Sequence, residues 1–331
     1  MKKYDVYGLG NALVDMEFEV HDAFLQQNNI DKGVMTLVDE KQQHDLMCQL
    51  DAFGGNKASG GSAANTLIAI SAMGGKACYS CKVADDELGH FYLHDLSAAG
   101  VDCNRDNTHK NGITGKCLVM VSPDAERTMH TFLGVSSDLS PAELDADAIK
   151  NAHYCYMEGY LTTSPSAKQA NIEARKIAEN NGIKTALTFS DPFVVEHFRD
   201  DFTQTIGDGI DLLFCNEAEA LSYTQKTSID DAINSIKTFA RQFAITLGKA
   251  GAVVFDGNTL LEIAPYSVNA IDTNGAGDMF AGAFMYGITH GYDFARAGDL
   301  ASQASSKIVS QFGPRLKTED YQLLITGSLS C

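Results

Sequence analysis

The sequence predicts an α/β protein, with a mainly parallel sheet covered by helices on both faces and a smaller, separate sheet. From about residue 140 to residue 256, strand-like runs alternate with segments of helical length, which is typical of parallel sheets. Runs at 16–20, 34–38 and 114–132 do not fit this alternation, and we assign them to the smaller sheet. A glycine-rich turn near residue 275, followed by an apolar helix, completes the pattern.

The first half of the chain contributes elements to both sheets. Residues 16–20 alternate between apolar and polar side chains, as a half-buried strand does. Asp39 stands as a cap before an amphipathic helix. The expected strands are 4–10, 16–20, 34–38, 77–83, 114–122 and 127–132, and the expected helices are 39–50, 67–73 and 85–96.

The second half follows a regular strand–helix order. The expected strands are 153–157, 184–189, 210–215, 243–247 and 252–256, and the expected helices are 165–180, 194–205, 229–242 and one that starts near 216. A half-apolar run at 259–271 is rich in residues that favour strands. After it, apolar residues at 279, 280, 283, 284 and 288 have helical spacing.

Composition limits the class of protein. With 331 residues, 44% hydrophobic and 21% charged, the chain can bury a sizeable core as one large α/β domain, or as one domain with an appendage. No apolar run approaches the roughly 20 residues that span a bilayer. The first residues lead directly into a strand and lack the apolar region of a signal peptide, so we expect a cytoplasmic protein.

Charge and cysteine content exclude other classes. A formal net charge of −18 disfavours nucleic acid and anionic membranes as partners. The same charge means that a nucleotide polyphosphate would need local amides, a Lys or Arg and a divalent metal. Cys78 and Cys81 form a C-x-x-C without a second pair at zinc-binding spacing, so we interpret the eight cysteines as mainly buried, reduced thiols.

The stretch Asp272-Thr273-Asn274-Gly275-Ala276-Gly277-Asp278 is the strongest functional signal. Small residues in the turn let the backbone approach a ligand, and the first amides of the following helix have no intrahelical partner. Such a helix start attracts anions, above all phosphate. Asp278 is placed to accept a proton from a hydroxyl that attacks a phosphate. Taken alone, a capped glycine turn explains the same residues.

Polar residues after the first strand are further candidates. Asn11 and Asp15 follow the strand at the edge where parallel sheets bind ligands, although a turn and a solvated carboxylate are the simpler explanation. Glycines at 8 and 10 suggest a dinucleotide site, but position 13 is Leu and a strand follows, so this interpretation fails. The glycines at 60 and 61 precede a helix and again allow close approach of the backbone.

Three more candidates lie later in the chain. Asn216 and Glu219 are three residues apart at a helix start, where Glu219 could hold Mg²⁺ or could interact with the helix dipole. The turn at 246–251 could contact a nucleotide, but it is not a Walker A loop. Arg127 opens the second strand of the hairpin, where a solvated charge is the usual explanation.

Four segments together resemble the ribokinase-like (PfkB) family of carbohydrate and nucleoside kinases, and within it the adenosine kinases. The 272–278 string is similar to the family signature D-T-x-G-A-G-D, and Gly60-Gly61-Ser62-Ala63-Ala64-Asn65 to a second signature. Gly10-Asn11-Ala12-Leu13-Val14-Asp15 resembles the opening of nucleoside kinases, and Asn216-Glu217-Ala218-Glu219 resembles an N-x-x-E motif. The resemblance spans essentially the whole chain.

The resemblance implies a fold, an activity and cofactors. It implies one ribokinase-like domain over 1–331, a three-layer α/β/α sandwich with a small β-sheet lid formed by inserts at about 14–40 and 111–134. It also implies an ATP-dependent kinase that acts on a primary hydroxyl of a nucleoside, with adenosine favoured. The implied cofactors are ATP, Mg²⁺ and a potassium-type cation. The expected partner is a small-molecule acceptor, and the protein would be a monomer or a homodimer.

The resemblance also implies roles for individual residues. Asp278 would be the catalytic base. The anion hole would be formed by Gly275, Ala276 and Gly277. Arg127 would neutralise the charge of the phosphoryl group during its transfer. The nucleotide would be bound by Asn216, Thr246, Gly248, Gly251 and Asn274. The acceptor would be bound by Asn11, Asp15, Gly60, Gly61, Asn65, Glu158 and Tyr160, with Asp15 taking two hydrogen bonds from a vicinal diol. The metal ligands would be Glu219 and, for the monovalent cation, Asp272.

Departures from the pattern leave alternatives open. Only Tyr160 is available to stack on a base, Glu158 is more like the sugar-binding carboxylate of ribokinases, and Asp191 stands where a small residue is usual. A sugar kinase that acts on ribose, fructose or a keto-deoxy sugar acid is therefore an alternative. From another class, a non-catalytic nucleoside-binding protein would be expected to lack Asp278 or the glycines of the anion hole, and neither is missing.

Overall fold

The large sheet of this protein has nine strands, and most of them run parallel. The computed structural model describes residues 2–50, 56–103, 108–109, 111–124 and 126–327. The two strands at one edge, β15 and β16, pair antiparallel. In order across the sheet the strands are β16 (Leu260–Ile263), β15 (Ala252–Phe255), β14 (Ala240–Thr246), β13 (Ile210–Asn216), β12 (Lys184–Thr188), β11 (Ala152–Glu158), β1 (Tyr4–Leu9), β5 (Ala77–Ser80) and β7 (Val101–Cys103).

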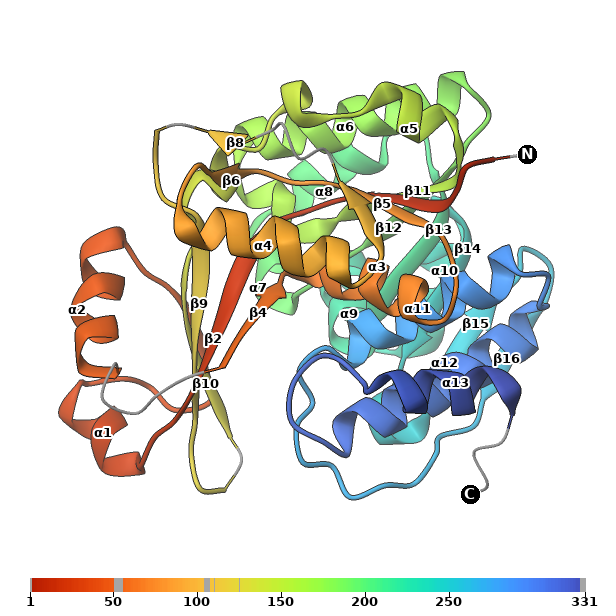
Figure 1. The fold of residues 1–331 in the computed structure, drawn as a ribbon. Helices are drawn as coiled ribbons and strands as arrows, with labels where there is room; N and C mark the ends of the chain where they lie inside the picture. The colour runs from red at the N-terminus through yellow and green to blue at the C-terminus, as the bar shows by residue number, and fades with distance from the viewer. Residues whose placement is uncertain (1, 51–55, 104–107, 110, 125, 328–331) are drawn as a thin grey trace.

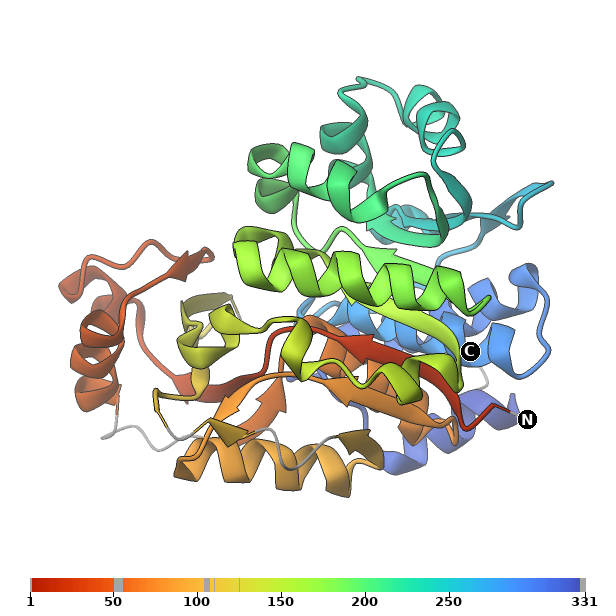
Figure 2. The same ribbon diagram turned by 90° about the horizontal axis from the view of Figure 1, so that it is seen from above.

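Helices cover both faces of this sheet, which gives the three layers that the resemblance implies (Figures 1 and 2). In Figure 2, α6 lies on one side of β1 and α4 on the other. One face carries α5 (Ala146–Lys150), α6 (Pro165–Asn180), α7 (Pro192–His197), α8 (Arg199–Ile206), α9 (Glu217–Thr224) and α10 (Ile229–Ile236). The other carries α3 (Ser62–Ala72), α4 (Glu87–Ala98), α11 (Ala276–Thr289), α12 (Phe294–Val309) and α13 (Thr318–Thr326).

Strand alternation explains why one sheet supports two cores. In β11, Tyr154 and Tyr156 belong to the core under α3 and α11, whereas Cys155 and Met157 belong to the core under α6. Successive side chains of a strand point to opposite faces, so a strand covered on both sides is apolar throughout. The short 3-10 helices Gly134–Asp138, Pro141–Glu143, Gly159–Thr163 and Gly248–Ala250 connect these elements.

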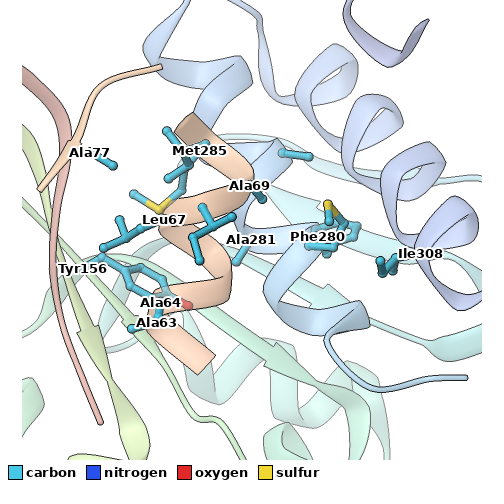
Figure 3. Close-up of a cluster of buried hydrophobic side chains, with 14 of the residues drawn as sticks. Ala63, Ala64, Leu67, Ala69, Ala77, Tyr156, Phe280, Ala281, Met285 and Ile308 are labelled. Atoms are coloured by element: carbon cyan, nitrogen blue, oxygen red, sulfur yellow. The ribbon is translucent and has the colours of Figure 1, made fainter. Parts of the chain in front are cut away.

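The packing of α3 against α11 determines where the candidate site forms. Figure 3 shows Leu67, Ala69, Ala281 and Met285 in the buried cluster that these two helices share. A Cβ added at Gly282 would lie 2.7 Å from both the Ala69 Cβ and a backbone oxygen of α3, so only glycine permits this approach. The close contact brings together the first turns of the two helices.

The smaller sheet has five strands and projects from the large sheet (Figure 1). Its order is β3 (Met35–Leu37), β10 (Arg127–Phe132), β9 (Gly115–Val121), β2 (Leu13–Glu19) and β4 (Asn56–Gly60). Its outer face, with Met16 and Phe18, packs against α1 (Asp22–Gln27) and α2 (Glu40–Leu50), which contribute Leu25 and Leu46. The opposite face is directed toward the large sheet and carries Asp15. A short pair, β6 (Val83–Ala84) and β8 (Thr108–His109), forms a third sheet.

Several element predictions differ from the structure. The helix expected at 67–73 begins at Ser62, so that Asn65 lies in its first turn. The helix expected at 229–242 ends at Ile236, because the next strand begins at Ala240. Of the run 259–271, only residues 260–263 form a strand, and the remainder crosses the surface. Strand β4 was not expected, because its residues are mostly small or polar.

Other sequence interpretations concern the thiols and membrane association. Cys78 and Cys81 are buried and unpaired, as expected. In the described part of the chain, no helix combines the length and apolarity needed to cross a bilayer.

Candidate active site

Asp278 lies in the first turn of α11 and is held by two side chains from the first turn of α3. Its Oδ1 accepts a hydrogen bond from Ser62 Oγ at 2.6 Å, and its Oδ2 accepts one from Asn65 Nδ2 at 3.2 Å. Burial raises the pKa of Asp278 to about 6, although both hydrogen bonds act to lower it. The structure therefore brings predicted residues Asn65 and Asp278 together and holds a carboxylate that is ionised at neutral pH.

The turn before α11 has the geometry of an anion hole. Gly275 is the N-cap with φ of 73°, a left-handed conformation that favours glycine. A Cβ at Gly275 would also lie 2.9 Å from the Pro314 Cβ, whereas a Cβ at Gly277 would meet nothing within 4 Å. The first amides of α11 lie at the positive end of the helix dipole, although that of Ala276 donates a hydrogen bond to the Thr273 carbonyl oxygen at 3.3 Å. An anion can thus approach Gly277 without obstruction.

Asp15 lies on the face of the small sheet that is directed toward Asp278. Gly60 is next to it, because a Cβ at Gly60 would lie 2.2 Å from the Asp15 Oδ2. Burial raises the pKa of Asp15 to about 7, and the guanidinium groups of Arg315 and Arg127 act in the opposite direction. The Asp15 carboxyl is thus partly buried against Gly60, and it lies close enough to Asp278 for the two charges to interact.

Asn11 and Glu158 form a buried hydrogen-bonded unit behind this site. Glu158 is fully buried, and its Oε1 accepts hydrogen bonds from both Asn11 N and Asn11 Nδ2 at 3.1 and 3.0 Å. Its Oε2 accepts one from Ala63 N at 2.9 Å. Gly61 must lack a side chain, because a Cβ there would lie 2.2 Å from the Asn11 carbonyl oxygen. Glu158 therefore joins the ends of β1 and β11 to the start of α3, and burial raises its pKa to about 7.

Arg127 and Asp272 form an ion pair between the small sheet and the segment before the anion hole. The distance from Arg127 Nη2 to Asp272 Oδ2 is 2.6 Å, and the same Nη2 lies 2.7 Å from Glu17 Oε1. Asp272 also accepts hydrogen bonds from Asn274 N and Gly313 N, each at 3.0 Å. Both oxygens of Asp272 thus face donors. The role of Asp272 in binding a monovalent cation stays a prediction.

Asn216 and Glu219 form a capping box at the start of α9. Glu219 Oε2 accepts from Asn216 N at 2.9 Å and Oε1 accepts from Asn216 Nδ2 at 2.8 Å, while Asn216 Oδ1 accepts from Glu219 N. Glu219 is buried, which raises its pKa to about 7, and the negative charges of Asp191 and Asp278 add to this effect. Glu219 thus interacts with the start of α9, as one of its two sequence interpretations had it, and it also lies within electrostatic reach of Asp278.

The other predicted nucleotide contacts lie at neighbouring strand ends. Thr246 ends β14, next to Asn216 in the parallel register. Gly248 and Gly251, with φ of 57° and 92°, turn the chain into β15. Asn274 is held by Asp272 through its amide. These residues lie at the ends of adjacent strands or in the turn before α11, whereas the acceptor candidates Asn11 and Asp15 follow β1.

A cavity of about 390 Å³ lies beside the small sheet, within the range of small-molecule sites. Its wall is mainly apolar, with a few polar groups. The lining residues are Leu37, Val38, Glu40, Gly112, Ile113, Thr131, Phe132, Leu133, Gly134, Val135, Ser137 and Asp138. Tyr160 is not among them. It is half-buried in a 3-10 helix, and burial together with the charges of Asp191 and Asp278 raises the pKa of its hydroxyl.

Comparison with known proteins identifies the family. The pfkB family carbohydrate kinase profile matches residues 30–320. The chain belongs to this family. It is 27% identical to adenosine kinase of Saccharomyces cerevisiae, over 94% of this chain and 96% of that protein.

Solved structures of related kinases have the same fold. A probable sugar kinase from Rhizobium etli is 34% identical with a TM-score of 0.90, covering 99% of both chains. Adenosine kinase from Sinorhizobium meliloti is 35% identical with a TM-score of 0.89, covering 98% of both chains. The ribokinase-like fold and the assignment as a phosphotransferase are therefore confirmed, and the comparisons include kinases for both nucleosides and sugars.

Membership of the pfkB family implies ATP as the phosphoryl donor and usually Mg²⁺. Among the described residues, no group of three or more His, Cys, Asp or Glu side chains is arranged to hold a metal ion. Mg²⁺ retains several waters and is commonly held by one or two carboxylates and substrate phosphates. Both oxygens of Glu219 accept hydrogen bonds from Asn216, so such an ion would meet Glu219 through one of its waters and would be held mainly by the substrate phosphates.

Two residues of the candidate site, Ser62 and Glu17, were not predicted from the sequence. Ser62 holds Asp278, and its position three residues before Asn65 in a helix start was the available signal. Glu17 holds Arg127, and its position two residues after Asp15 in an alternating strand places both carboxylates on one face.

The pH dependence of the pfkB reaction should report on Asp278. Because a protonated Asp278 cannot accept a proton, we expect kcat at saturating acceptor to fall below about pH 6. Ser62→Ala removes a hydrogen bond that lowers this pKa, so the acidic limb should move to higher pH. The check is a pH–rate profile of the variant beside Ser228→Ala, at the remote start of α10, which should keep the wild-type limb. If the acidic limb of the pH–rate profile does not move in Ser62→Ala, a group other than Asp278 is responsible for it.

Proposed function

We propose that this protein is an ATP-dependent kinase that transfers the γ-phosphoryl group to the 5′-hydroxyl of a nucleoside, with adenosine as the favoured acceptor. The observation that carries the choice of a nucleoside is the relation between Asp15 and the apolar cavity. A nucleoside has a vicinal diol on its ribose and a flat, weakly polar base next to it. It therefore needs a hydrogen-bond acceptor and an apolar slot on one surface.

The hydrogen-bond acceptor and the apolar cavity lie along one row of cross-strand neighbours in the small sheet. Asp15 is opposite Cys117, Cys117 is opposite Thr131, and Thr131 is opposite Leu37. Thr131 and Leu37 line the cavity. Paired residues point to the same face, and neighbouring strands lie about 4.8 Å apart, so the cavity begins roughly 10 Å from Asp15. This separation suits a ribose bound at Asp15 with its base in the cavity.

The chemistry follows from the groups around Asp278. The 5′-oxygen attacks the γ-phosphorus, the bond from that phosphorus to the bridging oxygen breaks, and ADP leaves. The proton of the hydroxyl passes to the Asp278 carboxylate, which Ser62 and Asn65 hold in place. Charge on the transferred group is stabilised by the first-turn amides of α11 and by Arg127. Mg²⁺, when bound to the ATP phosphates near Glu219, would neutralise further negative charge.

A sugar kinase is the second candidate, and one solved relative is described as a probable sugar kinase. The sequence feature that favoured it was Glu158. In the structure this carboxylate has no exposed surface and accepts three hydrogen bonds from Asn11 and Ala63. Its availability to sugar hydroxyls would require these bonds to break, which supports the nucleoside over the sugar.

The proposal is tested by ADP release from Mg-ATP with a panel of acceptors. The panel comprises adenosine, inosine, guanosine, cytidine, ribose, fructose and 2-keto-3-deoxygluconate. We expect adenosine to have the highest kcat/KM, with other nucleosides ahead of the free sugars. A free sugar as the best acceptor would favour the second candidate. Binding of nucleosides without turnover of any acceptor would favour a non-catalytic binding protein.

A further inference from the structure

The Arg127–Asp272 ion pair connects two parts of the molecule that are distant in the chain. Arg127 belongs to strand β10 of the small sheet, and Asp272 precedes the turn into α11. The Arg127 side chain is only 7% exposed and that of Asp272 only 2%. A charge-assisted bond of this kind, largely removed from water, is screened much less than a surface ion pair.

On the side of the large sheet, Asp272 is part of the anion-hole backbone. It accepts hydrogen bonds from Asn274 N, directly before Gly275, and from Gly313 N, directly before Pro314. Pro314 in turn lies against Gly275, the N-cap of α11. A change in the position of Asp272 would therefore move both segments that shape the turn.

On the side of the small sheet, Glu17 joins Arg127 to the acceptor site. Glu17 lies two residues after Asp15 in β2, so the two carboxylates share one face. Glu17 and Asp272 both contact the same nitrogen, Nη2, of Arg127. The Nε of Arg127 is buried and has no hydrogen-bond partner among the residues that the structure describes. Glu17 and Asp272 thus share one nitrogen of a guanidinium that is almost entirely shielded from solvent.

We propose that Asp272 and Glu17 are positioning residues that use Arg127 to couple acceptor binding on the small sheet to the shape of the anion hole. This inference rests on the proposed function. An acceptor that fixes β2 and β10 also fixes Arg127, which then holds Asp272 and the amides of the turn in the arrangement that binds phosphate. By linkage, an acceptor that tightens nucleotide binding is itself bound more tightly when the nucleotide is present.

The test measures the affinity of the non-hydrolysable ATP analogue adenylyl-imidodiphosphate, with Mg²⁺, by calorimetry in the absence and presence of saturating adenosine. For the wild type we expect adenosine to tighten analogue binding by about fivefold or more, within the range of typical site–site coupling. In Arg127→Gln and Asp272→Asn the ratio should fall below about twofold. Arg127→Lys, which keeps the charge, should restore part of it. Arg241→Gln breaks an exposed ion pair with Asp211 and should retain the wild-type ratio.

A second measurement needs no ligand. Hydrogen exchange of the ligand-free protein should be faster in Arg127→Gln than in the wild type for the segments 272–277 and 311–315. It should not change in these segments in Arg241→Gln. Unchanged exchange in Arg127→Gln would overturn the structural link.

The possible results distinguish a failure of the coupling inference from a failure of the proposed function. If the wild type phosphorylates adenosine but Arg127→Gln and Asp272→Asn keep the full coupling ratio, the inference is wrong and the proposed function stands. If the variants weaken analogue binding equally with and without adenosine, Asp272 only builds the turn, and the inference is again wrong. If the wild type binds neither ligand, the proposed function fails, and the coupling inference fails with it.

Discussion

Asp278→Asn is expected to lower kcat by about three or more powers of ten, because the variant loses the group that accepts the 5′-hydroxyl proton. The substitution fits the site sterically. Asn65 Oδ1 has no hydrogen-bond partner among the described residues, so a 180° turn of that amide would let it accept from the new side chain. The KM for adenosine should change little, since Asp278 acts in the transition state. Single-turnover and steady-state assays measure both quantities.

Stability measurements provide the control for Asp278→Asn. The folded protein raises the pKa of Asp278 from 3.8 to about 6, so keeping this group ionised in the fold costs stability at neutral pH. Its removal should therefore stabilise the protein by about 1–3 kcal/mol at pH 7. The gain should vanish as the pH falls below about 4, where the carboxyl is protonated in both states. A variant that is stable yet keeps wild-type kcat would show that Asp278 is not the base.

Asp15→Asn is expected to lower kcat/KM for adenosine by about 10²- to 10⁴-fold. Above about pH 7, where Asp15 is mostly ionised, a carboxylate that accepts two hydrogen bonds from a diol contributes about 1.5–3 kcal/mol through each bond. A neutral amide can accept only one of them well. Steady-state kinetics with adenosine measure the loss.

The matched control for Asp15→Asn is a substrate without the diol. With 2′,3′-dideoxyadenosine the wild type should be slow, and the substitution should change kcat/KM by less than about tenfold. An equal loss for adenosine and the dideoxy compound would mean that Asp15 maintains the sheet instead of binding ribose.

Much of the fold was predictable because its signals are local. The alternation of strands and helices after residue 140 and the glycine turn at 275–277 depend on neighbouring residues. The capping box of Asn216 and Glu219 is visible as a three-residue spacing. Strand β4 was not predictable, because residues 56–60 lack an apolar pattern and pair with β2 only in the folded sheet.

The contacts within the site required the structure, because they depend on packing between distant segments. Asn65 and Asp278 are 213 residues apart and meet only because α3 and α11 pack closely at Gly282. Arg127 pairs with Glu17 and Asp272, which come from separate parts of the chain. The burial of Glu158 likewise depends on β1, β11 and α3 together. The sequence predicted which residue types matter, but it could not show how they are paired.

Phosphoryl transfer to adenosine can be followed directly with labelled ATP. The protein is incubated with γ-labelled ATP, Mg²⁺ and either adenosine or a free sugar from the acceptor panel, and the products are separated and identified by mass spectrometry. We expect the label on the 5′-oxygen of adenosine, with one ADP formed for each AMP, and we expect Asp278→Asn to abolish this transfer. Label found only in inorganic phosphate, or transferred to the free sugar but not to adenosine, would show that the protein is not a nucleoside kinase.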